Sequence, residues 1–253
     1  MSFIQRLLVV CFVLSSGWLI CRLYFTAGLE RPASGEHPID KWWHMLLTHI
    51  GNIIFYWEWV LSLYRLGYGF YEQQSSILDI IIRISLGFYF AMWLCDVIAG
   101  TVHWFGDTAD MYFFSYHHRD SRYMTRQSYV HHCWDSLALA LILSVIIPPF
   151  RTSALLTTVR IIACQANEAH MWAHCTSKEI PPLVKSLQST TVILSWKSHK
   201  DHHKPPHLKD YCVFNGWANP IMNKILRGPV TQWVETNIRD NPKWIELKKV
   251  LDT

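Results

Sequence analysis

A hydrophobic stretch from Ile77 to Trp104 constrains the fold of this chain more than any other feature. A helix of roughly 20 apolar residues is long enough to cross the hydrocarbon core of a membrane. Asp96 and His103 would then lie near the far end of the span. We therefore predict a membrane-spanning helix that presents His103 on one particular side of the bilayer.

Two apolar stretches precede this one. Phe3 to Phe25 is compatible with a signal peptide, a signal anchor or a first span; its length, and the lack of a small-residue cleavage site before Glu30, favour an anchor. Glu30 to Asp40 is a polar linker that contains proline. Trp42 to Tyr64 is apolar and rich in tryptophan but also carries polar residues, so it either spans the membrane or lies in its interface.

Two further apolar stretches follow. Leu137 to Phe150 is short for a span and ends in two prolines, and Ser153 to Ala169 is apolar again and continues into His170 and His174. They predict a helical hairpin with a very short turn. The expected fold is therefore an all-α, multi-span membrane helical bundle with about four spans.

The number of crossings decides where the histidines lie. If the Ile77 span ends on one side and the hairpin leaves from and returns to that side, the histidines from His103 to the cluster at His199 all share it. The loops of that side also carry most of the Lys and Arg residues, whereas the opposite loops offer chiefly Arg65 and Arg151. Cytoplasmic loops carry an excess of Lys and Arg, so we predict a His-rich metal-binding cap on the cytosolic side.

Composition agrees with a membrane protein that has a polar part. Hydrophobic residues make up 51% of the chain and charged residues 17%, yet the mean hydropathy is only +0.11. The net charge of +4 is spread along the chain without a basic helix or motif, so no nucleic-acid partner is expected. The seven cysteines include no Cys-x-x-Cys motif, which argues against a disulfide framework. Cys133, Cys175 and Cys212 lie near histidines and leave a zinc site as an alternative.

The remaining segments predict peripheral helices. Pro181 to Trp196 is moderately apolar and is expected to form an interfacial helix under the His-rich cap. After Asn219-Pro220 the chain is typical of short amphipathic helices. We predict an anchor and linker at residues 1–40, a membrane-embedded domain at 41–225 and an amphipathic tail at 226–253.

The histidine spacing predicts metal binding. Helical residues three and four positions apart share a face, so His199, His202 and His203 can converge on one point, as can His170 and His174. Imidazole suits zinc, copper and iron, and such a site in a membrane-like chain indicates oxidative chemistry on lipid. Eight or more imidazoles suit two ions with about four ligands each.

Two acidic residues are expected to support this site. Asp96 and Asp107 lie seven residues before and four residues after His103, on the same helical face if the helix continues. Carboxylates at such positions orient ligand imidazoles by hydrogen bonding. For Asp107 a capping or loop role is an equal alternative.

The ordered motifs resemble those of the Kua/CarF family of lipid desaturases. The resemblance covers roughly Ile77 to Ile225. Its motifs are Asp96 with Val102-His103-Trp104 and Asp107-Thr108, then His117-His118, then Asn167-Glu168-Ala169-His170 with His174, then His199-Lys200-Asp201-His202-His203 with Pro206-His207, Tyr211-Cys212 and Gly216-Trp217-Ala218-Asn219.

This resemblance implies a multi-pass enzyme of the endoplasmic reticulum membrane. Its histidines would hold two non-haem irons, which use dioxygen and electrons from cytochrome b5 and its reductase to oxidise a membrane phospholipid chain. The leading reaction converts plasmanylethanolamine to a vinyl-ether plasmalogen; another acyl-lipid desaturation or a hydroxylation on the same site is the alternative.

The resemblance also implies a set of site residues. No catalytic residue separate from the metal ligands is expected. The implied ligands are His103, His117, His118, His170, His174, His199, His202 and His203. Additional candidate ligands are His207, His131 and His132, of which the last two are extra to the family pattern and equally compatible with a surface loop. Asp96, Asp107 and Asn167 are the expected residues behind the ligands.

The chain departs from the family pattern at five positions. They are Gln127, Cys133, Ser136, Thr191 and Ser198. These departures bear on the substrate and, to a lesser degree, on activity. A non-catalytic protein that binds or transports zinc through the same histidines is the alternative of another class, although a transporter needs polar ligands near the middle of the membrane.

Overall fold

The structure is a computed structural model that describes residues 42–251, and all regular elements in this part are helical. The predictions for Phe3 to Phe25 and for Glu30 to Asp40 lie outside the described residues. The chain divides into two compact units. In their described parts, the first comprises residues 42–94 and 128–165, and the second comprises residues 95–127 and 166–251. The division into three segments at residues 40 and 225 stays a prediction.

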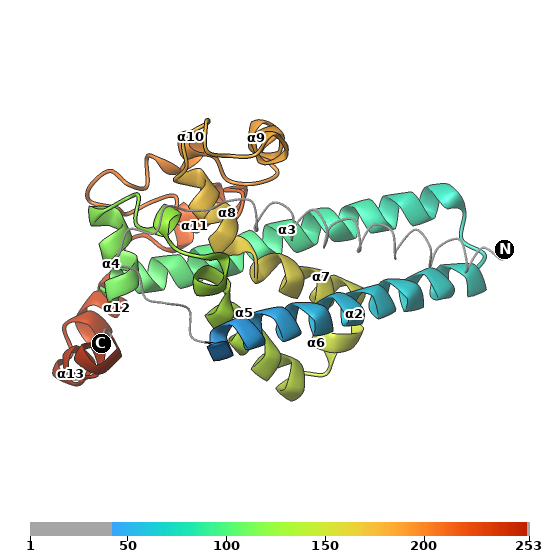
Figure 1. Cartoon of the computed structure of the whole chain (residues 1–253), viewed down its shortest axis with the longest axis horizontal. Coiled ribbons are helices and arrows are strands. Elements are labelled where there is room, and N and C mark those ends of the chain that lie inside the picture. The colour runs from blue at the N-terminus through green and yellow to red at the C-terminus, as the bar shows by residue number, and fades with distance from the viewer. Residues whose placement is uncertain (1–41, 252–253) are drawn as a thin grey trace. The chain divides into compact units, whose positions relative to one another are not determined.

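Four helices make up most of the first unit. They are α2 (Trp42–Glu72), α5 (Tyr129–Ile146), α6 (Pro149–Thr152) and α7 (Ala154–Ala163), and α2 contacts each of the other three (Figure 1). Their core contains Phe55 of α2, Leu137 of α5 and Ile161 of α7. Two of these helices have a serine at the N-cap position. The side chain of Ser128 accepts a hydrogen bond from the backbone N–H of His131 at the start of α5, and the side chain of Ser153 accepts one from the backbone N–H of Leu156 at the start of α7.

A buried arginine joins the helices of this unit. Arg160 of α7 donates a hydrogen bond to Ser144 of α5 at 2.6 Å and pairs with Glu58 of α2 at 2.7 Å. Its guanidinium also lies 4.0 Å from the centre of the Phe55 ring. A buried charge is tolerated when it is paired and hydrogen-bonded, so this network specifies how α2, α5 and α7 pack.

Two of the described helices are candidate membrane spans. The helix α3 (Ile77–Thr108) has 32 residues and α5 has 18, and both are long and apolar enough to cross a bilayer. The Ile77 stretch is therefore helical as predicted. The helix α2 is long but less apolar than these two, and both alternatives for Trp42 to Tyr64 stay predictions.

The second limb of the predicted hairpin is not one continuous helix. The helix α7 ends at Ala163, and α8 (Ala166–Ala173) begins after two turn residues. Gln165 donates its backbone N–H to Ile162, three residues back, at 2.9 Å. This tighter turn breaks the α-helical hydrogen-bond pattern before His170.

Short helices joined by loops make up the second unit, together with the end of α3. They are α4 (Tyr112–Arg119), η1 (Met124–Arg126), α8, α9 (Pro182–Ser189), α10 (Trp196–His199), α11 (Asn219–Ile225), α12 (Pro229–Val234), η2 (Glu235–Arg239) and α13 (Pro242–Leu251). The short helices predicted for the C-terminal tail are confirmed. The helix predicted from Pro181 to Trp196 is shorter than expected, because residues 190–195 are not helical.

The end of α3 is anchored to a loop of the second unit. The carboxylate of Asp96 accepts hydrogen bonds from the backbone N–H groups of Phe214, Asn215, Gly216 and Ala218, at 2.9 to 3.2 Å. Nearby, a Cβ at Gly100 would lie 2.7 Å from the sulfur of Cys212. Glycine at position 100 therefore permits the close approach of the loop to the helix.

Candidate metal centre

Eight histidines from four short segments converge within the second unit. His103 lies on α3, His117 and His118 lie on α4, and His170 lies on α8 with His174 just after its end. The last three belong to the segment that begins with α10. These residues are His199, His202 and His203.

The helix predicted for the last three histidines is wrong after its first turn. The helix α10 ends at His199, and His202 and His203 lie in turns. Pro205 and Pro206 follow, and a proline disfavours helical geometry in the residue before it and removes a backbone donor. His202 still donates its backbone N–H to His199 at 3.0 Å, which keeps these side chains close together.

The histidines form two groups that could each hold a metal ion. The first group contains His117, His170, His174, His199 and His203. The second contains His103, His117, His118 and His202. Within each group the candidate ligand atoms lie within 4.8 Å of one another, and His117 belongs to both. The neighbours His202 and His203 thus face different groups, as the dinuclear prediction allowed.

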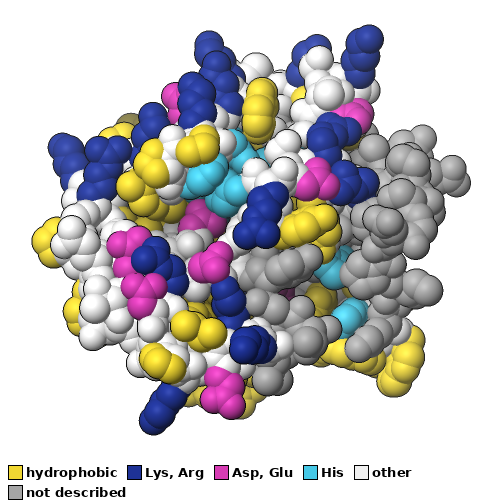
Figure 2. Space-filling view, turned by 90° about the vertical axis from the view of Figure 1, so that its left-hand side faces the viewer, with side chains coloured by type: hydrophobic (Ala, Val, Ile, Leu, Met, Phe, Trp, Pro, Cys, Tyr) yellow, Lys and Arg dark blue, Asp and Glu magenta, His cyan; other side chains and the backbone are white. Residues whose placement is uncertain are grey.

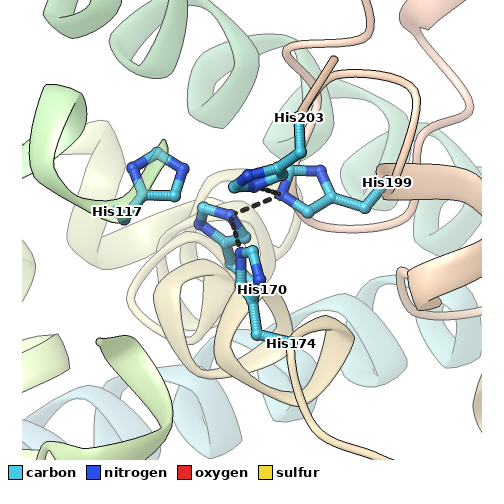
Figure 3. Close-up of side chains that lie close together, drawn as sticks. All are labelled: His117, His170, His174, His199 and His203. Carbon is cyan, nitrogen blue, oxygen red and sulfur yellow. Dashed lines mark hydrogen bonds between the residues drawn. The ribbon is translucent and has the colours of Figure 1, made fainter. Parts of the chain in front are cut away.

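The nitrogen contacts in the first group fit a shared cation better than a hydrogen-bond network. Nε2 of His170 lies 2.8 Å from Nε2 of His199 and 3.1 Å from Nε2 of His174, and Nε2 of His199 lies 3.0 Å from Nε2 of His203 (Figure 3). A neutral imidazole nitrogen carries either one hydrogen or one lone pair, so at most two of these three contacts can be hydrogen bonds at once. Nitrogens that bind one ion at about 2.0–2.1 Å lie roughly 2.9–3.4 Å apart.

Backbone carbonyls orient the rings of the second group. Nδ1 of His103 lies 3.2 Å from the carbonyl oxygen of Tyr211, and Nδ1 of His202 lies 2.8 Å from that of Lys209. With a proton on Nδ1, each ring directs the lone pair of Nε2 inward, and the two Nε2 atoms lie 3.3 Å apart.

The two predicted supporting carboxylates have different roles. Asp107 lies 3.1 Å from Nε2 of His118, 3.3 Å from that of His202 and 3.5 Å from that of His103. It therefore faces the inner nitrogens of the second group. Asp96 instead accepts four backbone hydrogen bonds and anchors the loop at residues 214–218. Its carboxylate is thus used by this loop, and not to orient an imidazole as expected.

Burial keeps the imidazoles in the form that binds metal. Loss of solvent lowers the pKa of His117, His170 and His199 well below the usual value, and the neighbouring histidines lower it further. The same causes lower the pKa of His174 to about 3 and that of His203 to about 2. Neutral imidazole is the ligand that a metal requires, so the donor set fits metal ions at neutral pH.

Comparison with known proteins places this site within one family. A family model described as the lipid desaturase domain matches residues 92–240, which is more than half of the chain and includes all eight histidines. The chain belongs to this family. No solved structure matches the chain.

Named relatives of this lipid desaturase domain come from plants, animals and bacteria. Fatty acid desaturase 4-like 1, chloroplastic, of Arabidopsis thaliana is 23% identical over 73% of this chain and 64% of its own length. Plasmanylethanolamine desaturase of Myxococcus xanthus is 32% identical over 51% of this chain and 52% of its own length. Plasmanylethanolamine desaturase 1 of Mus musculus is 29% identical over 54% of this chain and 59% of its own length. The chain thus spans between about half and two thirds of the length of these relatives.

The remaining candidate ligands lie outside both groups of the lipid desaturase domain. His131 and His132 lie on α5 in the first unit, and His132 is buried, so the surface-loop interpretation is wrong for it. His207 belongs to the second unit, where its Nδ1 donates to the carbonyl oxygen of His202 at 2.9 Å and its ring centre lies 4.3 Å from that of His118. Asn167 is a half-buried residue of α8. Cysteine belongs to neither group, which leaves the predicted zinc alternative through cysteine without support among the described residues.

Some residues that shape the site had no signal in the sequence. Tyr211 and Lys209 act through backbone carbonyls, which any residue provides. Arg122 donates a hydrogen bond to the carbonyl oxygen of His174 at 3.1 Å and pairs with Glu179. A basic residue followed far along the chain by an acidic one is too common a pattern to predict such a bridge.

The departures from the family pattern lie outside the two groups. Gln127 is buried after η1, at the end of a segment of the second unit. Thr191 has a positive φ of 58° in the loop after α9, and the hydroxyl of Ser198 lies 3.2 Å from that of Ser195. Cys133 is part of the core of the first unit. Both groups are thus formed without these positions.

Proposed function

We propose that this protein is a membrane oxidoreductase that desaturates a phospholipid chain with dioxygen at a two-metal site. The observation that carries the proposal is the pair of histidine groups that share His117 inside the segment matching the lipid desaturase family. The desaturase names of the relatives support the reaction class.

The two groups support a division of the ligands between two ions. The first ion would be held by His170, His174, His199 and His203 with His117 at its edge. The second would be held by His103, His118 and His202, with Asp107 as a carboxylate that balances its charge. We propose iron for both, because imidazole and carboxylate suit iron and a desaturation removes electrons that zinc cannot accept. Two such irons supply the oxidising chemistry with dioxygen.

The residues of the chain prepare the site for this reaction. Burial keeps the imidazoles neutral, and the carbonyls of Tyr211 and Lys209 hold two of the rings in one orientation. Asp96 fixes the loop that follows Tyr211. The electrons for each turnover would come from a cytochrome b5-type donor and its reductase.

For the substrate we propose plasmanylethanolamine, which would become a vinyl-ether plasmalogen. Two relatives carry the name plasmanylethanolamine desaturase. The fatty acid desaturase name of the plant relative supports the alternative of an acyl-lipid desaturation or hydroxylation on the same site.

For the location we propose the endoplasmic reticulum membrane, with about four spans and the histidine groups on the cytosolic side. The candidate spans α3 and α5 support a membrane protein. The excess of Lys and Arg in the loops near the histidines supports the orientation.

Expression in cells that lack plasmalogens tests the reaction and the substrate together. Wild-type protein should restore vinyl-ether lipids, and His199→Ala should not, because His199 lies at the centre of the first group. His49→Ala, an exposed position on α2 in the first unit, is the matched control. Correctly expressed wild-type protein without vinyl ethers would contradict the substrate; a product that differs from its lipid by two hydrogens or one oxygen would then indicate the acyl alternatives.

A further inference from the structure

A cavity whose wall includes several charged residues borders the second histidine group. It has a volume of about 280 Å³ and lies within the second unit. Asp107 and His118 form part of its wall, so one side of the cavity is the outer edge of the candidate metal site. Figure 2 shows histidine side chains that are visible at one face of the molecule, next to acidic side chains and among Lys and Arg side chains.

The cavity wall also carries charges of both signs. Arg119, Arg239 and Glu235 line it. Nη1 of Arg239 lies 2.8 Å from Oε1 of Glu235, and Nε of Arg239 donates to Oδ1 of Asp240 at 2.9 Å. The side chains of Arg239 and Glu235 remain partly exposed. Positive and negative groups therefore stand side by side at the cavity surface.

Arg119 is available to a ligand in the cavity. Its acidic neighbour Asp110 accepts a hydrogen bond from Nζ of Lys248 at 2.7 Å, and also accepts one from the hydroxyl of Ser115. Lys248 and Ser115 thus hold the carboxylate of Asp110. Arg119 is an exposed residue, and the planar donor pattern of its guanidinium is well suited to a phosphate.

We propose that this cavity binds the headgroup of an ethanolamine phospholipid, with the phosphate at Arg119 and Arg239 and the ammonium at Glu235. The inference rests on the proposed function and names the part of the substrate that the site selects. A zwitterionic headgroup complements the paired charges of Arg239 and Glu235, because each of its charges meets an opposite one. The cavity thereby sets headgroup specificity.

The volume and position of the cavity fit a headgroup and not a lipid chain. Sites for whole small molecules have volumes of about 300–1,000 Å³, and this cavity is near the lower limit with a charged wall. The double bond of a vinyl ether begins at the carbon attached to the ether oxygen, and only the glycerol unit separates that ether oxygen from the phosphate group. A headgroup held beside His118 therefore keeps that carbon close to the histidine groups.

Lipid binding to the full-length protein tests the proposal without turnover. Purified protein in phosphatidylcholine nanodiscs would receive alkyl ether lipids with an ethanolamine, choline or glycerol headgroup, and native mass spectrometry would measure the retained lipid. We expect Glu235→Gln to reduce the preference for ethanolamine over glycerol about tenfold, since a charge-assisted hydrogen bond is lost. Arg119→Gln should weaken the binding of all three lipids, because each carries a phosphate.

Two controls and two competitors make the result decisive. Glu246→Gln and Lys243→Gln change the same charges on α13, outside the cavity wall, and should leave the headgroup preference unchanged. Glycerophosphoethanolamine should displace the lipid only weakly, and inorganic phosphate less still. Displacement by inorganic phosphate as effective as by the lipid itself would identify a free-phosphate site and overturn the proposal.

The headgroup cavity and the proposed function can be contradicted independently of each other. Glu235→Gln and Arg119→Gln proteins that fold and retain the wild-type headgroup preference would overturn the headgroup cavity even if the wild-type protein makes vinyl ethers. A wild-type protein that makes no vinyl ether but binds ethanolamine lipid through Glu235 would support the cavity while contradicting the formation of a vinyl ether from that lipid. In active cells, the headgroup distribution of the vinyl-ether lipids should change with Glu235→Gln in the same direction as binding.

Discussion

Nε2 of His170 and Nε2 of His199 lie 2.8 Å apart, although 29 residues separate them along the chain. Both side chains are buried, and each also contacts a second imidazole nitrogen of the same group. The three contacts among these four nitrogens cannot all be hydrogen bonds at once, because each neutral Nε2 carries only one hydrogen or one lone pair. A metal ion at their centre removes this conflict, because it accepts every lone pair.

Substitution of His199 should therefore remove one ion. We expect about two irons per wild-type chain and about one in His199→Ala, because the second group keeps its own ligands. Elemental analysis of purified protein measures this, with His49→Ala as the control. Stoichiometric zinc without iron in wild-type protein would contradict the oxidoreductase and support the zinc-binding alternative.

Acid should destabilise the protein after removal of bound metal by a chelator. The pKa values of His174 and His203 are lowered to about 3 and about 2, chiefly by burial and then by neighbouring histidines. Unfolded histidines bind protons below about pH 6.5, whereas the folded ones do not until about pH 3. The unfolded state thus holds more protons in this window, and the free energy of unfolding should decrease as the pH falls from about 6.5 toward 3. Thermal unfolding at several pH values checks this; a melting temperature that is constant from pH 7 to 4 would argue against buried neutral histidines.

Asp96→Asn should loosen the loop at residues 214–218. One carboxylate oxygen accepts three of the four backbone hydrogen bonds, and an amide nitrogen in either position would oppose a donor with another donor. We expect a loss of about 2–4 kcal/mol in stability. Asp79→Asn, which removes only an exposed pair with Arg83 on the same helix, should cost less than about 1 kcal/mol. Equal effects of the two variants in thermal unfolding would contradict the anchoring role of Asp96.

Gly100→Ala should separate α3 from the same loop. The added Cβ would lie 2.7 Å from Sγ and 3.2 Å from Cα of Cys212, and a backbone atom cannot move aside cheaply. Overpacking of this kind costs about 1–3 kcal/mol. Gly87→Ala lies on the same helix with no atom within 4 Å of the new Cβ and should be neutral or slightly stabilising. If both variants unfold at the same temperature, the close approach at Gly100 is not important for stability.

Arg160→Met should disrupt the first unit. It removes the partner of Glu58 and the donor to Ser144, which leaves a largely buried carboxylate with only Arg151. Removal of one partner of a buried pair costs about 3–5 kcal/mol. The double variant Arg160→Met with Glu58→Gln should recover part of this loss, because no uncompensated charge remains. Denaturant unfolding in detergent measures both, and a double variant that is less stable than the sum of the single changes would contradict the pairing.

Local spacing predicted much of the helical structure. The apolar stretch at Ile77 and the short helices after Asn219 follow from the pattern of residues. The eight histidines that converge are those that the family resemblance implied. The spacing of His199, His202 and His203 predicts a longer helix than the structure has. Pro205 and Pro206 prevent the helix from continuing. The helical break at Cys164 and Gln165 could not be predicted, because no proline or glycine lies there.

Long-range contacts decided the details of the site. Nε2 of His103 and Nε2 of His202 meet across 99 residues, and no local periodicity specifies such a pair. For the same reason Asp107 faces the imidazoles while Asp96, on the same helix, anchors a loop. His131 and His132 match the site in residue type, yet they belong to the other compact unit.

The sequence by itself determined the chemistry that is available: a membrane-like chain, imidazoles in numbers sufficient for two ions, and the motif order of a lipid desaturase family. Only the tertiary structure decided how the imidazoles divide between two groups, which carbonyls orient them and which charged residues line the neighbouring cavity. The reason is physical. Helical periodicity acts over a few residues, whereas the grouping depends on how turns and buried contacts bring four distant segments together.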